Sequence, residues 1–144
     1  MAAELEYYKE HAAHGRHVEL QRSAVAGLTA TLSGGLVGEL LKQGALTRSQ
    51  LPYSMSLFAL GFVSFLLSAK LYERFRLHNA IAREARNKLD PSLAALRSTV
   101  EREHKKEFPF LYKLPLHLVW NSLFALMGLV GLVTTVLILS KSRS

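Results

Sequence analysis

The sequence predicts an all-α integral membrane protein with three transmembrane helices and a basic cytoplasmic helical hairpin between the second and the third. Three observations carry this prediction: one long stretch without charge, two shorter apolar stretches with a single charge near one end, and a cluster of Lys and Arg after the second stretch. We therefore expect four segments: a polar N-terminal helix (1–22), a transmembrane helical hairpin (23–71), a basic cytoplasmic hairpin (72–113), and a third transmembrane helix with a short tail (114–144).

The long uncharged stretch covers residues 116–140 and is mostly made of large apolar side chains. A helix of this length rises roughly 37 Å at about 1.5 Å per residue, which is enough to cross a hydrocarbon core of about 30 Å. One end of the stretch carries His117 and Trp120, whose rings have polar tips, and the other end is followed by Lys141 and Arg143. Such residues are typical of the two membrane–water interfaces. The alternative is a buried helix of a soluble core, but 144 residues could scarcely surround a helix that is apolar on every face.

The N-terminal segment, residues 2–21, is polar and is expected to be helical, interrupted only at Gly15. His11, His14 and His17 recur every three residues and share roughly one helical face. Such a face could hold a transition metal, yet no carboxylate completes a known ligand pattern. We therefore expect no metal and no cofactor, and interpret the histidines as a solvated or partner-contacting face.

Residues 23–41 are divided by side-chain size rather than by polarity. Small residues repeat every four positions in two adjacent rows, and leucines form the opposing ridge. Helices in lipid associate through such small residues because their backbones can approach closely. We therefore predict a transmembrane helix that packs on another helix through Gly27, Ala30, Thr31, Gly34, Gly35 and Gly38.

Glu39 extends the row that contains Gly35, which places one carboxylate on the predicted packing face near a membrane boundary. In a symmetric ring this carboxylate could line or gate a pore, where a circle of like charges favours cations. Alternatively, it reaches outside water and pairs with Lys42, three residues further on. Both interpretations remain open.

The second span covers residues 53–71, preceded by a polar connector and by Pro52 near the first helical turn. Lys70 closes it. Because the connector from residue 42 to residue 50 is short, the first two spans should be antiparallel neighbours.

Between Lys70 and Lys113 lie 11 of the 18 Lys and Arg residues, against six acidic residues. The positive-inside rule places this segment in the cytoplasm, together with the N-terminus, and the short connector and the tail outside. We predict an integral membrane protein with a basic cytoplasmic surface formed by Arg74, Arg76, Arg83, Arg86, Lys105 and Lys106.

The basic segment should begin as a continuation of the second span to residue 89, after which Asp90 and Pro91 form a cap and first turn for another helix. Each helix carries one narrow apolar stripe, such as Leu93, Leu96 and Val100. These stripes are too small for a globular core, so the two arms should pack on each other or on copies in neighbouring subunits. Aromatic residues over 108–112 should form an interfacial elbow.

Signals of catalysis are weak. Arg97 and His104 have a spacing that resembles the Arg-x4-6-His motif of HEPN ribonucleases, in which these two residues act on an RNA phosphodiester. With 18 basic residues and six histidines such a spacing arises by chance, and we predict no catalytic residues and no enzymatic activity.

The polar helix, close-packed membrane hairpin and basic helical extension together resemble small membrane proteins of bacterial anti-phage and CRISPR-associated systems. The residues that carry the resemblance flank the first two spans: Tyr7, Tyr8, Arg16, Gln21 and Arg22, then Leu71, Tyr72, Arg74, His78 and Arg83. The families concerned are the SLATT effectors, the RipA-like membrane proteins and the type VI-B CRISPR membrane accessory proteins, which usually have two membrane helices where this chain has three predicted.

The resemblance implies a homo-oligomer that depolarises or permeabilises the bacterial inner membrane when an infection signal arrives. The alternative is a membrane anchor or scaffold whose basic hairpin recruits a cytoplasmic protein, anionic lipid or, less expected, nucleic acid. In both cases the partners are membrane lipid and other copies of the chain.

Overall fold

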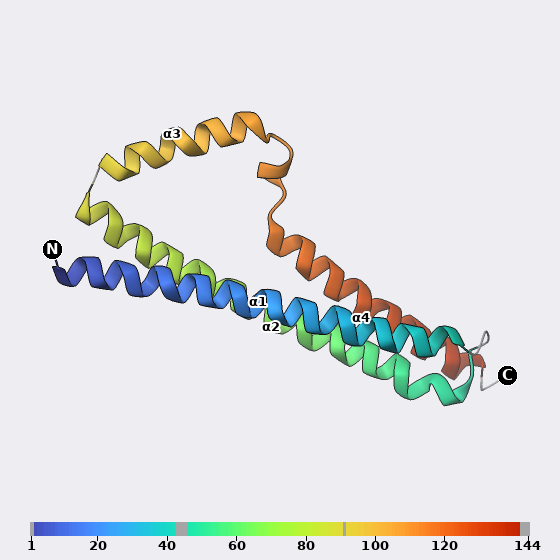
Figure 1. The fold of residues 1–144 in the computed structure, drawn as a ribbon. Coiled ribbons are helices and arrows are strands. Elements are labelled where there is room, and N and C mark those ends of the chain that lie inside the picture. Colours follow the sequence, from blue (N-terminus) through green and yellow to red (C-terminus); the bar gives the residue numbers. More distant parts are fainter. Residues whose placement is uncertain (1, 43–45, 91, 142–144) are drawn as a thin grey trace. The chain divides into compact units, whose positions relative to one another are not determined.

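Four α-helices form the architecture of the protein in a computed structural model that describes residues 2–42, 46–90 and 92–141. In chain order they are α1 (Ala2–Lys42), α2 (Leu51–Leu89), α3 (Ser92–Glu107) and α4 (Leu116–Lys141) (Figure 1). Two short 3-10 turns, Arg48–Gln50 and Leu111–Lys113, precede α2 and α4. These three ranges contain no β-strand, which confirms the all-α prediction.

Three of these helices, α1, α2 and α4, are long and apolar enough to cross a membrane. The bounds of α4 match the predicted third span, and α2 runs unbroken from the second span to Leu89, with Pro52 in its first turn. The polar N-terminal helix and the first span form the single helix α1, so the break expected at Gly15 is wrong. Gly15 instead lies buried against Asn79, with its Cα side facing the amide oxygen.

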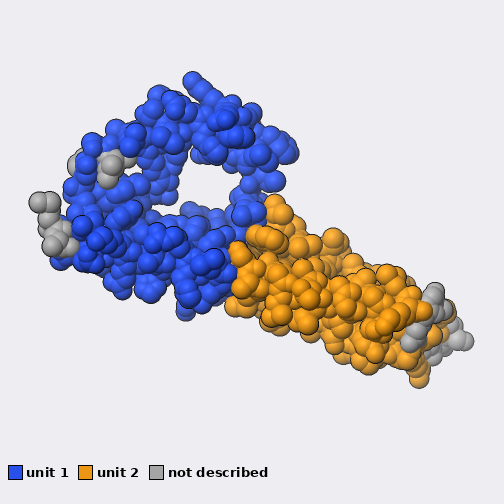
Figure 2. Space-filling model, viewed as in Figure 1, with its two compact units in different colours: residues 1–22, 70–118 blue, residues 23–69, 119–144 orange. Residues whose placement is uncertain are grey.

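The chain divides into two compact units, shown in different colours in Figure 2. Unit 1 consists of residues 1–22 and 70–118, and unit 2 of residues 23–69 and 119–144. The polar N-terminal helix thus belongs with the basic segment. The predicted spans form the other unit.

Unit 2 is held together by glycines at the contact between α2 and α4. A Cβ at Gly61 would lie 2.7 Å from the Cα of Gly128, and a Cβ at Gly131 would lie 2.8 Å from the Cα of Phe58. Real side chains do not approach a backbone so closely, so the two helices meet only because these positions lack a side chain. Phe124 and Leu57 are fully buried beside them.

Hydroxyl groups add polar contacts inside unit 2. Thr29 Oγ1 on α1 lies 2.8 Å from Ser64 Oγ on α2, and both residues are buried. Thr135 Oγ1 on α4 lies 2.9 Å from Ser54 Oγ on α2. Buried Gln50 donates from Nε2 to the carbonyl oxygen of Leu40 at 2.8 Å, which fixes the end of α1 to the start of α2.

The outer surface of unit 2 is apolar. Large side chains stay exposed along all three helices, including Leu28, Leu32, Met55, Phe62, Val63, Leu66, Leu126, Leu129 and Val136. The interior, by contrast, contains Ser33, Ser54, Ser64 and Ser68. Although Leu57, Phe124 and Ile138 are also buried, a unit with several hydroxyl side chains inside and so many large apolar side chains outside reverses the pattern of a soluble domain.

In unit 1 the N-terminal part of α1 packs against the C-terminal part of α2. Val18 and Ala82 are buried there, and His11 lies beside His78, 67 positions away in the sequence. The sequence left two arrangements open for the extension of α2 and the following helix, which could pack on each other or on copies in neighbouring subunits. Packing on copies stays a prediction, and the structure of one chain tests only the pairing within that chain. That pairing is wrong for the stripe on α3, because Leu96 and Val100 are 61% and 54% exposed.

The junction between α2 and α3 follows the predicted cap. Asp90 Oδ1 accepts hydrogen bonds from the backbone N–H of Ser92 at 2.8 Å and from its hydroxyl at 2.7 Å. The expected role of Pro91 in the first turn, and the side chain of Leu93, lie outside the described residues. Beyond α3, the rings of Phe108, Phe110 and Tyr112 are exposed, as an interfacial elbow requires.

Candidate functional site

The six small residues predicted as a packing face all point away from the interior of unit 2. We call this set, Gly27, Ala30, Thr31, Gly34, Gly35 and Gly38, the small-residue face. All six are exposed, and a Cβ at any of the four glycines would meet no atom of the described chain within 4 Å. Within residues 2–42, 46–90 and 92–141, no helix therefore packs over these four glycines.

Inside unit 2, α1 packs through a neighbouring row of the same helix. Ala26, Thr29 and Ser33 are buried, and Ser33 Oγ donates a hydrogen bond to Met127 Sδ at 3.3 Å. These residues are also small, so the sequence correctly indicates a helix suited to close packing. It does not distinguish the row used within the chain from the one left outside.

Part of the small-residue face continues into a groove between α1 and α2. Thr31 and Gly35 form one wall, and Ser56, Ala59 and Val63 form the other. Leucines of both helices complete the lining: Leu32, Leu36 and Leu60. The small and hydroxyl side chains at Thr31, Gly35, Ser56 and Ala59 admit the close approach of another helix, and the leucines and Val63 offer it an apolar contact.

Glu39 is half-exposed near the end of α1 and forms an ion pair with Lys42. This is the i,i+3 pair that the sequence allows. Within one chain the carboxylate is thus partly neutralised by a neighbour on its own helix, and exposed pairs of this kind contribute little to stability. Any pore-lining role depends on other copies of the chain.

The predicted basic surface divides into two groups. Arg74 and Arg76 on α2 and Lys105 and Lys106 on α3 are exposed, and Lys105 Nζ lies 5.6 Å from the centre of the Tyr112 ring. Exposed Arg83 and half-buried Arg86 also line one small cavity of unit 1. Which of these basic residues lie close together therefore depends on how the helices pack, and their positions in the sequence do not reveal it.

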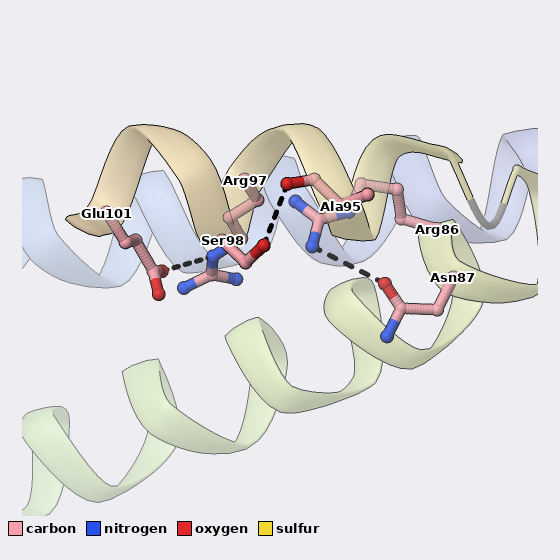
Figure 3. A network of polar contacts seen from close by, with 6 residues as sticks. All are labelled: Arg86, Asn87, Ala95, Arg97, Ser98 and Glu101. Atoms are coloured by element: carbon pink, nitrogen blue, oxygen red, sulfur yellow. Dashed lines mark hydrogen bonds and ion pairs between the residues drawn. The ribbon is translucent and has the colours of Figure 1, made fainter. Parts of the chain in front are cut away.

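The same cavity is lined by Arg97, which the sequence did not assign to the basic surface. Figure 3 shows Arg86 on α2 and Arg97 on α3 with their guanidinium groups in the space between these helices. Arg97 Nε pairs with Glu101, and Arg86 donates to Asn87 Oδ1 at 3.5 Å, the limit of a hydrogen bond. Ser98, beside Arg97, donates to the carbonyl oxygen of Ala95 at 2.8 Å.

The spacing that resembles a ribonuclease motif is not assembled into a pair. His104 lies against aromatic rings, with centroid distances of 5.1 Å to Phe108 and 6.4 Å to Tyr112. Arg97 is engaged with Glu101. Among the described residues, no contact joins this arginine to this histidine.

Two of the three N-terminal histidines meet His78 of α2. His11 Nδ1 and His78 Nδ1 are 2.9 Å apart, and the His14 ring stacks on the His78 ring at 5.2 Å. Burial, together with the nearby His11, His14 and Arg74, lowers the pKa of His78. His17 lies elsewhere, 3.1 Å from the amide nitrogen of Gln21. Across the described ranges, no group of three potential ligands could hold a metal ion.

A buried arginine that the sequence analysis assigned to no site lies at the end of the N-terminal part of α1. Arg22 is only 3% exposed and pairs with Glu19 at 3.2 Å. Its guanidinium lies 5.7 Å from the centre of the Tyr72 ring, which stacks on His117 at 3.9 Å. The sequence offered one signal for this cluster: Arg22, Tyr72 and His117 each lie beside the end of a predicted span, where cationic and aromatic side chains often meet.

No family model matches the chain, and neither does any curated protein or solved structure. Function is therefore inferred from the chain's own chemistry.

Proposed function

We propose that the protein is a homo-oligomeric membrane effector whose assembly depolarises or permeabilises a bacterial inner membrane. The observation that carries this proposal is the exposed small-residue face of α1. A helix surface with open space over Gly27, Gly34, Gly35 and Gly38 is suited to a neighbouring helix. We infer that the neighbour is a second copy of the chain, because α2 and α4 of the same chain contact α1 through Thr29 and Ser33, outside the small-residue face.

Membrane insertion is supported by the reversed packing of unit 2. Its exterior carries leucine, valine, methionine and phenylalanine side chains, and its interior carries buried hydroxyls, of which Ser64 bonds to Thr29 and Ser54 to the carbonyl oxygen of Leu51. In water, such an exterior would be a large exposed apolar surface, which soluble proteins avoid. In lipid it is solvated by acyl chains, while helices satisfy their own backbone hydrogen bonds.

The orientation follows from the distribution of positive charge. Residues 70–113 contain 11 Lys and Arg, and the residues after 140 contain two. We propose that the N-terminus and the basic segment are cytoplasmic, and that the connector after α1 and the C-terminus face outward. A reporter inserted near Asp90 should report the cytoplasm and one fused after Ser144 the outside, whereas a cytoplasmic C-terminus would leave one predicted span uninserted.

Glu39 gives the oligomer an electrostatic property. In a ring, each copy would contribute one carboxylate near one membrane boundary, and repeated carboxylates attract cations. Lys42 is exposed beside it and is free to turn toward water, so the pair seen in one chain can separate at low cost. The proposed pathway is therefore selective for cations over anions.

The proposal is tested by ion release from liposomes that contain the purified protein. Wild type should release K⁺, and Gly35→Leu should abolish release, because a leucine on the small-residue face holds the neighbouring helices apart. Leu126→Ala on the exposed side of α4 is the matched control and should release K⁺ like wild type. Glu39→Gln should retain assembly and lose the preference for K⁺ over Cl⁻. An assembled wild type that releases neither ion would contradict the effector function.

A second function, that of an anchor or scaffold, is favoured by the clustering of Arg83, Arg86 and Arg97. In that case unit 1 binds a partner at the cytoplasmic side while the spans retain it at the membrane. The liposome experiment separates the two functions, because a scaffold assembles or remains single without releasing ions.

A further inference from the structure

We propose that the cavity of unit 1 lined by Tyr8, Asn79, Arg83, Arg86 and Arg97 is a binding pocket for a phosphate-bearing anion. This proposal rests on the second proposed function, that of an anchor or scaffold, and names the chemical class of ligand that unit 1 would bind. It does not depend on self-association or on ion release.

Three helices contribute to this pocket. Tyr8 and Ala12 come from α1, and Arg97 comes from α3. The floor is formed by one face of α2, which contributes Asn79, Ala82, Arg83 and Arg86. Because residues 79, 82, 83 and 86 follow the i, i+3, i+4, i+7 pattern, their side chains share one side of the helix.

The charge of the lining is entirely positive. None of the lining residues is acidic, and three of them are arginines. Arg97 is paired with Glu101, but neither Arg83 nor Arg86 has an acidic partner in the described part of the chain. Like charges held together without counter-charges repel each other, so the arrangement gains stability when an anion enters.

Arg86 provides an independent sign of a missing acceptor. Its Nε is buried and has no hydrogen-bond partner, and its one bond, to Asn87, is at the distance limit. A buried donor without an acceptor is costly, and more so when it carries charge. Figure 3 shows this guanidinium between α2 and α3, and Arg86 is one of the residues that line the pocket.

The donor set fits phosphate best. Guanidinium groups are planar and donate two parallel N–H bonds to the oxygens of a phosphate or a carboxylate. Three guanidiniums, together with the Asn79 amide and the Tyr8 hydroxyl, provide more donors than one carboxylate can accept. A phosphate or diphosphate group, with its several charged oxygens, can accept them.

The size of the pocket limits the ligand. Its volume is about 270 Å³, just under the range of about 300–1,000 Å³ that is usual for small-molecule sites. The pocket therefore holds a phosphate or diphosphate group and little more. This group belongs either to a soluble phosphate compound or to the headgroup of an anionic phospholipid.

Binding is measured with the full chain in an uncharged detergent, using radiolabelled inorganic pyrophosphate as the soluble probe. In parallel, the chain is placed in nanodiscs of phosphatidylglycerol or of phosphatidylcholine, and retained lipid is counted by native mass spectrometry. Arg86→Gln should weaken binding at least about tenfold, because it removes charge-assisted hydrogen bonds. Arg76→Gln, an exposed arginine of the same helix outside the pocket, should change it less than about twofold.

Arg97→Lys is the second variant, because lysine keeps the positive charge but lacks the planar guanidinium that donates two parallel hydrogen bonds. It should give an intermediate loss of binding with an unchanged circular dichroism spectrum. Arg86-dependent binding of pyrophosphate identifies a soluble phosphate source, and Arg86-dependent retention of phosphatidylglycerol identifies a lipid headgroup; each supports the pocket. The proposal is overturned if wild type binds neither probe, or if Arg76→Gln weakens binding as much as Arg86→Gln.

Discussion

Adding one methyl group at Gly131 should separate α2 from α4, although the same change at Gly35 should be harmless to the fold. At Gly131, the new Cβ would lie 2.8 Å from both the Cα of Phe58 and the carbonyl oxygen of Ser54. These are backbone atoms, which cannot turn away as a flexible side chain can. The helices must therefore move apart by about 0.6 Å or more to restore ordinary contact distances.

The size of the effect follows from two opposing terms. Overpacking of this kind costs typically about 1–3 kcal/mol, while alanine gains up to about 1 kcal/mol over glycine in helix propensity. The difference is about 0–2 kcal/mol, and its upper half applies to Gly131→Ala because the new Cβ meets backbone atoms that cannot turn away. At Gly35 no described atom lies within 4 Å of the new Cβ, so only the favourable propensity term applies to the single chain.

The assay is unfolding by sodium dodecyl sulfate in mixed micelles, followed by the fluorescence of Trp120. This residue is the only tryptophan and lies on α4, so it reports the separation of that helix. Gly131→Ala should lower the midpoint of the transition and Gly35→Ala should leave it unchanged or raise it. Equal shifts of the same sign for both variants would refute the packing derived from the glycines.

Two further predictions concern unit 1. Because burial and the nearby His11, His14 and Arg74 lower the pKa of His78, the unfolded chain binds a proton at this residue more readily than the folded unit does, and the unit loses stability as pH falls below about 6.5. Exchange protection of amides 8–18 should decrease from pH 7 to pH 5, and His78→Gln should remove most of this dependence. Hydrogen bonds from Ser92 lower the pKa of Asp90, so the cap of α3 is present above pH 3.8 and is lost as pH falls through the lower folded value. Asp90→Ala should speed exchange at the Ser92 amide at neutral pH, and Asp90→Asn should largely preserve protection.

The helices were predictable because their signals are local. An uncharged run of 25 residues, a proline in a first turn and an Asp-Pro junction each act within a few positions, and α4, α2 and the Asp90 cap all follow them. The one misplaced break, at Gly15, has a tertiary cause. A glycine costs about 1 kcal/mol in a helix, yet here it permits the close approach of Asn79.

The contacts between distant segments were not predictable in the same way. Gly61 stands alone in its helix, and Gly128 and Gly131 are three positions apart, so neither forms the four-residue repeat that marks α1. Their role appears only when α2 and α4 are placed together. The pairing of His11 with His78 and the position of Arg97 near Arg86 likewise depend on which helix packs on which.

The central proposal, self-association through the small-residue face, is tested most directly by the mass of the particle in mild detergent. Light scattering combined with absorbance and refractive index gives the protein mass free of bound detergent. We expect wild type to have a mass several times that of the 16.1 kDa chain, and Gly35→Leu to have that of one chain with an unchanged helical spectrum. A wild-type particle of a single chain, or a Gly35→Leu particle as large as wild type, would contradict the assembly proposed for this face.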